Sequence, residues 1–366
     1  MINQNAVTKV AELMKERNLD ALLTVPSEDL VFLAGEKPWL CERFQGLFIK
    51  KNGEMFYIVN LLSEGEIRSM LGSEIKIYSW WDGEDFTDVV CEVLEKEGLK
   101  GGRIGVNMAA RAANILSIAE HMPVQFTDAR DLMNEVRIHK TPEELGYMRE
   151  AARIADKAVL ALWEVVKPGM TEQEVRRILR NYMQEFGGSN ADAIVSFGGN
   201  ASYPHYMPSG EGAILQEKDV LLTDFGCSYH GFQSDMTRTV FLGEPTAEEV
   251  KIYETVLAAN LAGEAAVREG AYIPDIDKAA RKVIEDAGYG EYFTTRLGHG
   301  IGYQAHESPE IKQSNRRHLE RGMAFSIEPG IYIPGVIGVR VEDIVVINEA
   351  GEREILNQVP KELKVL

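Results

Sequence analysis

The chain has 366 residues, of which 45% are hydrophobic and 26% are charged, as in a globular protein large enough for two domains. Its formal net charge of −18 argues against nucleic acid or an anionic membrane surface as a partner. No apolar run reaches the roughly 18 residues that a membrane span needs, and the first residues lack the basic and apolar blocks of a signal peptide.

The first 135 residues alternate between helix and strand patterns, which predicts an α/β domain. Val7, Val10 and Met14 share one helical face, and a Lys-Asn-Gly turn at 51–53 between two apolar runs predicts a hairpin. In chain order we expect helix 6–18, strands 21–25, 45–50 and 54–61, helix 85–97, strand 102–106 and helix 111–121.

A domain boundary is expected near residues 137–144, dividing the chain into 1–135 and 136–366. Thr141 can cap a helix that starts with Pro142, and Thr171 begins a second capping box. Helices precede antiparallel hairpins, which indicates an α+β second domain. The expected elements are helices 142–166 and 171–187, strands 193–197, 219–226 and 232–242, helices 246–269 and 273–287, and short strands after residue 288.

Cysteine usage indicates a reducing environment. The three cysteines, Cys41, Cys91 and Cys227, are odd in number and none has CxxC spacing, which disfavours a disulfide framework. We therefore expect a cytoplasmic protein.

Two aspartates lie in strand patterns on either side of a turn predicted at Tyr229-His230. A two-residue loop there places Asp224 directly opposite Asp235, because the two pairs of residue numbers have the same sum. Opposed residues have Cβ atoms about 4.5–5.5 Å apart, so one carboxylate would be protonated unless a cation lay between them. The spacing predicts a metal site; the alternative is an exposed edge with two unrelated acids.

A second acidic pair repeats this pattern. Glu328 and Glu342 are equally distant from Gly335, so a hairpin that turns at this glycine also brings two carboxylates together. Glu342 could instead pair with Arg340, although residues two apart share a strand face and both roles are compatible.

His299 lies between two glycines, which let the backbone approach another element closely and leave the ring free to point into a site. Four carboxylates with one imidazole suit a pair of hard or borderline divalent cations, and such a pair indicates hydrolysis. His306 follows seven residues later without forming an HExxH motif. His205 lies in a turn-rich loop, where surface exposure is the alternative.

The motifs around these residues resemble the metallopeptidase family of prolidase, aminopeptidase P and methionine aminopeptidase. They are Ser-Asp-Met-Thr-Arg-Thr at 234–239, Gly-His-Gly-Ile-Gly at 298–302, Glu-Pro-Gly-Ile-Tyr at 328–332 and Val-Arg-Val-Glu-Asp at 339–343. The resemblance covers residues 140–358 and implies a pita-bread catalytic domain. Residues 1–135 look like the creatinase-type N-terminal domain of prolidases and aminopeptidases P.

The resemblance implies a peptidase that hydrolyses Xaa-Pro bonds with two divalent metal ions. Asp224 and Asp235 would bind the first ion, and Asp235, His299 and Glu328 the second, with Glu342 bridging. A hydroxide shared by the ions would attack the scissile carbonyl. The oxygen-rich ligand set favours Mn²⁺, with Co²⁺ or Zn²⁺ as alternatives.

The same resemblance assigns roles beyond the metal ligands. Glu328 would carry the proton from water to the leaving amine. His205 and His306 match the two histidines that contact substrate, and Thr237 and Arg340 would orient the ligands. The expected partners are a small peptide substrate and a second copy of the chain, since family members form homodimers through the N-terminal domain.

Two residues concern substrate binding. Glu310 stands four residues after His306, where many prolidases have an Arg that binds the free carboxylate of a dipeptide. An acid there would repel that carboxylate unless Arg316 or Arg317 replaces the missing cation, so aminopeptidase activity on longer Xaa-Pro peptides stays open. Trp39 lies in a loop that either packs locally or covers an active site, a partner's included.

Two other functions stay open. The same scaffold could carry a metal-dependent hydrolase or lyase of a small non-peptide substrate, which residues outside the ligand set would decide. A non-catalytic binding module is the third hypothesis, but such relatives typically lose the metal ligands that this sequence retains.

Overall fold

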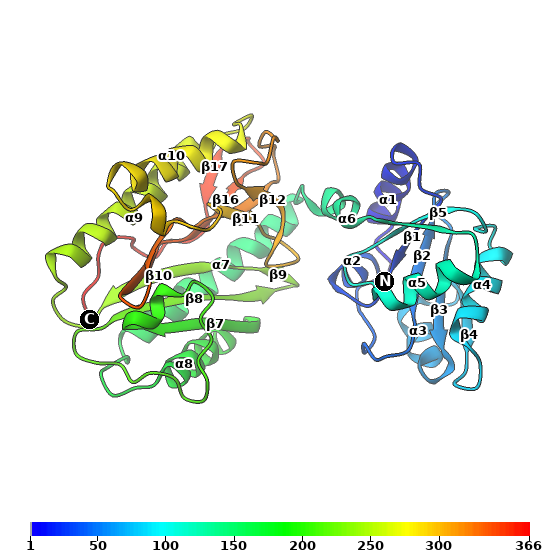
Figure 1. Cartoon of the computed structure of the whole chain (residues 1–366), viewed down its shortest axis with the longest axis horizontal. Coiled ribbons are helices and arrows are strands. Elements are labelled where there is room, and N and C mark those ends of the chain that lie inside the picture. Colours follow the sequence, from blue (N-terminus) through cyan, green and yellow to red (C-terminus); the bar gives the residue numbers. More distant parts are fainter. Residues whose placement is uncertain (1) are drawn as a thin grey trace. The chain divides into compact units, whose positions relative to one another are not determined.

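The computed structural model describes residues 2–366, which divide into two units (Figure 1). Unit 1 ends at Arg137, and unit 2 is Ile138–Leu366. Within the described residues, no helix combines the length and the apolarity that crossing a membrane requires.

Unit 1 is built on a six-stranded sheet in the order β4-β3-β2-β1-β5-β6, in which only β2 is antiparallel to its neighbours. Alternate strand residues face opposite sides, so Leu22 and Leu23 belong to different cores. The strands are β1 Ala21–Thr24, β2 Gly46–Lys50, β3 Met55–Asn60, β4 Lys76–Trp80, β5 Arg103–Val106 and β6 Gln125–Asp128.

Helices cover both faces of this sheet, as the mostly parallel strand order requires. One face packs against α1 Gln4–Glu16, α2 Glu28–Ala34, α3 Glu64–Leu71 and α6 Arg130–Arg137, and the other against α4 Phe86–Lys96 and α5 Ala112–His121. Every element expected in this half is present within two residues of its predicted ends. The prediction lacked α2, α3, α6, β4 and β6, which are all eight residues or shorter.

Exposed apolar side chains lie at one end of this sheet, beyond the carboxyl ends of three of its parallel strands. The strands β3, β4 and β5 run in the same direction, and Leu62, Trp81 and Met108 follow their last residues by one or two positions. Trp39, in the loop before β2, is 78% exposed, and its carbonyl accepts a hydrogen bond from Gln45 Nε2 at 3.1 Å. The alternative in which the Trp39 ring packs locally is therefore wrong.

Unit 2 consists of helix pairs packed on antiparallel sheets, as in Figure 1. The pair α7 Pro142–Trp163 and α8 Glu172–Glu185 packs on the sheet β10-β8-β7, with β7 Ser189–Phe197, β8 Val220–Tyr229 and β10 Met236–Phe241; the short β9 Phe232–Gln233 pairs with β8. Thr141 and Thr171 form the predicted caps, each with a complete capping box.

The second helix pair, α9 Ala247–Ala266 and α10 Ile273–Asp286, packs on the remaining strands. These are β11 Gly298–Gly300, β12 Glu307–Ile311, β13 Ala324–Ile327, β16 Asp343–Ile347 and β17 Arg353–Ile355 in one sheet, and β14 Gly330–Ile333 with β15 Ile337–Arg340 in another. The predicted fold class, α/β followed by α+β, is confirmed.

The register predicted for the first acidic hairpin is wrong. Asp224 pairs with Thr237, not with Asp235, and Tyr229 pairs with Phe232. The turn residues are His230 and Gly231, both with positive φ (48° and 85°), as a type I′ turn requires. The turn lies one residue later than predicted and shifts the pairing by two residues, which keeps Asp224 and Asp235 on the same face.

The register predicted for the second acidic hairpin is confirmed. Gly330 pairs with Arg340 in β14–β15, and Ile327 pairs with Asp343 in β13–β16. Both ladders centre on Gly335, which has φ of 70° at the turn. Glu328 and Glu342 lie between the two ladders in this same register.

Candidate metal centre

The two acidic hairpins meet through backbone contacts. Glu342 N–H donates to the Thr237 carbonyl at 3.2 Å, and Thr239 Oγ1 donates to the Arg340 carbonyl at 2.9 Å. These contacts join β10 to the end of β15 and bring the acids of both hairpins to one place.

All five predicted ligands belong to groups whose ligand atoms lie within 4.8 Å of one another. One group is Asp224, Asp235 and Glu342, and another is His299, Glu328 and Glu342. Because the two groups share Glu342, they form adjacent sites with one common carboxylate. Such an arrangement fits two divalent cations side by side.

The carboxylates strongly oppose one another's ionisation. Burial, followed by repulsion from other acids of the cluster, raises the pKa of both Asp235 and Glu342 well above their ordinary values. The pKa of Glu328 is also raised, mainly by burial, with Arg340 acting against the shift. Bound cations would remove this penalty, so the acids present fit a metal pair.

His299 is buried on β11 and aimed by its neighbours. Its Nδ1–H donates to the Gly300 carbonyl at 3.0 Å, which leaves Nε2 facing Glu328 Oε1 at 3.3 Å and Asp235 Oδ2 at 3.7 Å. Burial lowers the pKa of His299 to about 4, so the ring is the neutral imidazole that a cation binds. A Cβ on Gly298 would lie 1.9 Å from the Ser326 carbonyl, which confirms the predicted close backbone approach.

Arg340 and Thr237 hold the acids in place. Arg340 donates from Nη2 to Asp224 Oδ2 at 2.6 Å and from Nε to Thr237 Oγ1 at 2.8 Å. Thr237 Oγ1 in turn donates to Glu342 Oε2 at 2.6 Å. One guanidinium therefore orients an acid from each hairpin.

Two residues of the site were missing from the sequence analysis. Ser326 Oγ donates to Glu328 Oε1 and accepts from His299 N–H, both at 3.0 Å. Tyr332 OH accepts from Arg340 Nη1 at 2.8 Å. The signal for Ser326 was available, since it precedes Glu328 by two residues and shares its strand face.

His306 lies against the ligands and His205 lies near it. The rings of His306 and His299 meet edge to face with centroids 4.2 Å apart. Burial first, and then His299, lower the pKa of His306 to about 4, and His205 is close enough to contribute more weakly. Both His306 and His205 are nevertheless partly open to solvent, since each is an exposed residue. The buried pair Lys140–Glu307, at 2.6 Å, anchors the residue next to His306.

Glu310 does not stand as a lone acid. Arg296 Nη1 donates to Glu310 Oε1 at 2.8 Å, and Lys312 Nζ pairs with the other oxygen. Although partial burial opposes it, Lys312 and Arg296 lower the pKa of Glu310. Of the two arginines expected to supply a cation here, Arg316 donates to Tyr272 OH at 3.3 Å, and the cations that pair with Glu310 are Arg296 and Lys312.

A cavity of about 260 Å³ opens beside the acids, lined by Asp224, Asp235, Ile194, Met207 and Gln233. It gives the candidate centre room for a small substrate beside apolar side chains.

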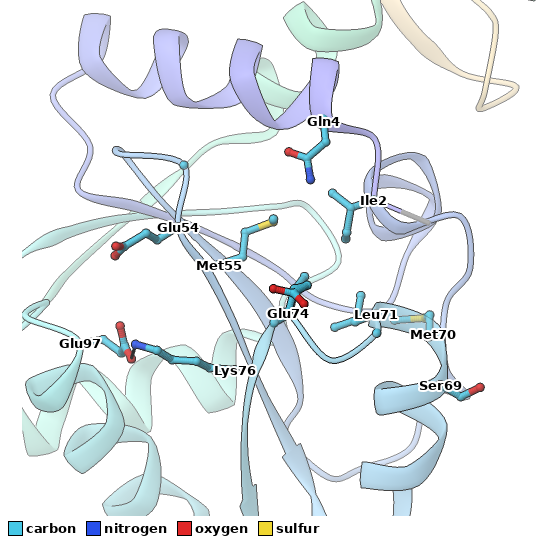
Figure 2. Close-up of a pocket in the computed structure, with 13 residues that line it drawn as sticks. Ile2, Gln4, Glu54, Met55, Ser69, Met70, Leu71, Glu74, Lys76 and Glu97 are labelled. Carbon is cyan, nitrogen blue, oxygen red and sulfur yellow. Dashed lines mark hydrogen bonds and ion pairs between the residues drawn. The ribbon is translucent and has the colours of Figure 1, made fainter.

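A larger cavity, of about 640 Å³, lies in unit 1 (Figure 2). Figure 2 shows Met70 and Leu71 at one end and Lys76 reaching toward Glu97 at the other, with Met55 between them. Among residues 2–366, the groups with metal-ligand geometry all lie in unit 2. The candidate chemistry therefore belongs to the smaller cavity.

The chain matches two family models, the creatinase/prolidase N-terminal domain over residues 7–139 and metallopeptidase family M24 over residues 146–349. The chain belongs to metallopeptidase family M24. Its unit 1 is the creatinase-type domain and its unit 2 has the pita-bread fold, as the sequence motifs predicted.

Solved structures of this family match along the whole chain. A dipeptidase of Pyrococcus horikoshii is 35% identical, with a TM-score of 0.90 over 99% of this chain and 100% of that one. A prolidase of Thermococcus sibiricus is 30% identical, with a TM-score of 0.93 over 100% of both chains. An Xaa-Pro dipeptidase of Bacillus anthracis is 29% identical, with a TM-score of 0.86 over 99% of both. The chain is thus an M24 metallopeptidase related to dipeptidases and prolidases.

Proposed function

We propose that this metallopeptidase hydrolyses Xaa-Pro peptide bonds with two divalent cations, of which Mn²⁺ suits the ligands best. The observation that carries the proposal is the pair of ligand groups that share Glu342. Asp224 and Asp235 would hold one cation, and His299 and Glu328 the other, with Asp235 reaching both. The oxygen-rich set with one imidazole favours Mn²⁺ over softer metals.

When bound, the cations would supply Lewis acidity, which lowers the pKa of water toward neutrality and offsets the negative charge that develops on the scissile carbonyl oxygen. Glu328 is the residue that would move the proton. Its Oε1 is held by Ser326, and its raised pKa suits a group that takes a proton from water and returns it to the leaving nitrogen.

His306 and His205 would bind the substrate from the rim of the site. A neutral imidazole can donate to a carbonyl oxygen without bringing a second positive charge beside the cations, and the low pKa of His306 keeps its ring neutral near pH 7. The preference for proline at the leaving position follows the named activity of the Bacillus anthracis relative.

We also propose that the protein is a homodimer whose interface includes the exposed apolar residues at the carboxyl ends of β3, β4 and β5 in unit 1. Trp39, Leu62, Trp81 and Met108 are all exposed at this end of the sheet, and a partner that covered them would bury their apolar area. Trp39→Ser with Trp81→Ser should then lower the mass measured by light scattering from two chains to one. An unchanged dimer would remove this surface from the proposal.

The test of the proposed reaction combines cation binding with turnover. The wild-type protein with Mn²⁺ should bind two ions per chain and cleave Ala-Pro, while Asp235→Asn should lose bound metal and about 1,000-fold in kcat/KM. Asp286→Asn, at a surface pair with Lys282, is the matched control and should change neither. Full activity in chelator, or full activity of Asp235→Asn, would contradict the proposal, and turnover of small non-peptide amides alone would favour the alternative substrate class.

A further inference from the structure

Arg296, Glu310 and Lys312 form a charged triad beside the ligand groups. Arg296 and Lys312 each pair with one carboxylate oxygen of Glu310, and Arg296 Nη1 lies 2.8 Å from Oε1. Counting one charge on each group, two positive and one negative, the triad presents a net charge of +1. The acid in this position therefore does not make the local field negative.

The triad lies at the histidine end of the site. Arg296 precedes His299 by three residues, and Glu310 follows His306 on β12, which pairs with β11 from Gly298↔Ile311 onward. After burial and the other histidine, the positive charge of Arg296 is among the contributions that lower the pKa of His306. The guanidinium is thus within electrostatic reach of His299 and of His306, the second of which would contact the substrate.

The guanidinium of Arg296 also has donors to spare. Within residues 2–366 it makes one hydrogen bond, from Nη1 to Glu310. Its Nε–H and Nη2–H groups form the geometry that binds a carboxylate through two parallel hydrogen bonds. Its side chain is about one-third exposed, so a small ligand can reach it.

We propose that Arg296, oriented by Glu310, binds the free α-carboxylate of a dipeptide substrate, and so makes this protein a dipeptidase rather than an aminopeptidase for longer chains. The inference rests on the proposed function and assigns its substrate class. Glu310 is a positioning residue, because it fixes the guanidinium, and Lys312 neutralises it from the other side. A longer peptide has an amide at this point, which offers Arg296 no charge to pair with.

The experiment compares Ala-Pro with Ala-Pro-NH₂, which lacks only the carboxylate charge, on the Mn²⁺-loaded protein. The wild type should prefer Ala-Pro by about 100-fold in kcat/KM, mostly through KM. Arg296→Met should lose about 100-fold on Ala-Pro and less than about threefold on the amide. Arg296→Lys should recover part of the loss, and Glu310→Gln should lose about tenfold on Ala-Pro alone.

Arg316→Met is the matched control, since Arg316 bonds to Tyr272 rather than to the triad, and it should leave both substrates unchanged. Equal losses on Ala-Pro and Ala-Pro-NH₂ in Arg296→Met would show a structural role and overturn the inference. So would a wild type that cleaves both substrates equally well. Thermal unfolding of each variant identifies one that is merely misfolded, in which case Arg296→Lys and Arg296→Gln decide.

A binding measurement separates this inference from the proposed function. Calorimetry should show that L-proline binds the Mn²⁺-loaded wild type more tightly than L-prolinamide does, and that Arg296→Met removes this difference. If the wild type cleaves no Xaa-Pro peptide but the difference is present and depends on Arg296, the proposed function fails and the carboxylate site stands. If cleavage occurs without such a difference, the carboxylate site is overturned and the function stands.

Discussion

Unit 2 contains two neighbouring acidic clusters, each partly buried, in which the repulsion between acids is offset in different ways. The candidate metal centre contains four acids, Asp224, Asp235, Glu328 and Glu342, and the guanidinium of Arg340 pairs with two of them, Asp224 and Glu342. The neighbouring cluster contains two acids, Asp343 and Glu264, and two cations, Arg238 and Lys361. In the candidate metal centre the acids outnumber the positive side chains, whereas in the neighbouring cluster the negative and positive charges are equal in number.

The balanced cluster is closed by contacts within the chain. Arg238 Nη2 donates to Asp343 Oδ1 at 2.7 Å, and Lys361 Nζ lies 2.6 Å from Asp343 Oδ2. Lys361 also pairs with Glu264, whose pKa burial nevertheless raises. Glu342 and Asp343 are adjacent in sequence, yet one faces each cluster. Arginine and lysine side chains therefore neutralise the acids of the cluster that stabilises the fold, whereas the acids of the candidate metal centre are left to be neutralised by metal ions from solution.

The largest expected effect is on the balanced side. Asp343→Ala should lower the free energy of unfolding by about 3–5 kcal/mol, because it leaves the buried Arg238 and the partly buried Lys361 without their shared partner. Urea unfolding of the metal-free protein measures this. A loss below about 1 kcal/mol would show that the network is not what holds this part of the fold.

The excess of acids in the candidate metal centre should be visible in how the stability of the metal-free protein depends on pH. Because folding raises the pKa of Asp235, Glu328 and Glu342, their contribution to stability is present below the ordinary carboxyl pKa and is lost as pH rises through the raised values. His299 and His306, with pKa lowered to about 4, act oppositely, but only as pH falls below about 6.5.

Above about pH 6.5, where the histidines no longer act oppositely, metal-free stability should therefore fall as pH rises, by up to about 1.4 kcal/mol per pH unit for each proton lost. Saturating Mn²⁺ should reverse the trend, because deprotonated acids bind the cation better. Melting curves in chelator and in Mn²⁺ across this range measure both slopes. A flat curve in chelator would contradict the charge imbalance.

A single substitution in the unbalanced cluster should have the opposite sign to Asp343→Ala. Glu342→Gln should raise the unfolding free energy of the metal-free protein by about 1–2 kcal/mol, since it removes one of several mutually repelling buried acids. It should also abolish the stabilisation that Mn²⁺ gives the wild type. Destabilisation without metal would show that Glu342 serves the fold rather than an ion.

The smallest expected effect concerns the hydroxyl between Glu328 and His299. Ser326→Ala should lower kcat about tenfold with little change in KM, because it loosens the proposed proton carrier without touching the substrate. Steady-state kinetics on Ala-Pro measure the split. A tenfold rise in KM with kcat unchanged would assign Ser326 to binding instead.

The sequence predicted much of this site, and its errors have physical causes. The hairpin around Gly335 was predicted correctly because its turn residue is a glycine at the centre of symmetry. The hairpin of Asp224 was misplaced because the two-residue loop was predicted at Tyr229-His230, whereas the type I′ turn uses Gly231 as its second residue, with positive φ at both His230 and Gly231. The prediction that Asp224 and Asp235 share one face of the sheet was still correct, because the pairing was shifted by an even number of residues.

Other contacts could not be predicted from local patterns. The bond between Arg296 and Glu310 joins residues 14 positions apart through a loop and two short strands, so no periodicity marks it. Lys361 reaches Glu264 from almost 100 residues away. Such pairs depend on how the helix pairs and sheets of unit 2 pack.

The alternation at Glu342 and Asp343 limits how this segment can change through evolution. A one-residue insertion or deletion at its start would turn every following side chain to the opposite face, so that Asp343 would face the candidate metal centre and Glu342 would face Arg238. Both clusters would fail at once, so no single compensating mutation could restore them. A substitution in this segment can alter one cluster and leave the other intact, whereas a change in its length would disturb both.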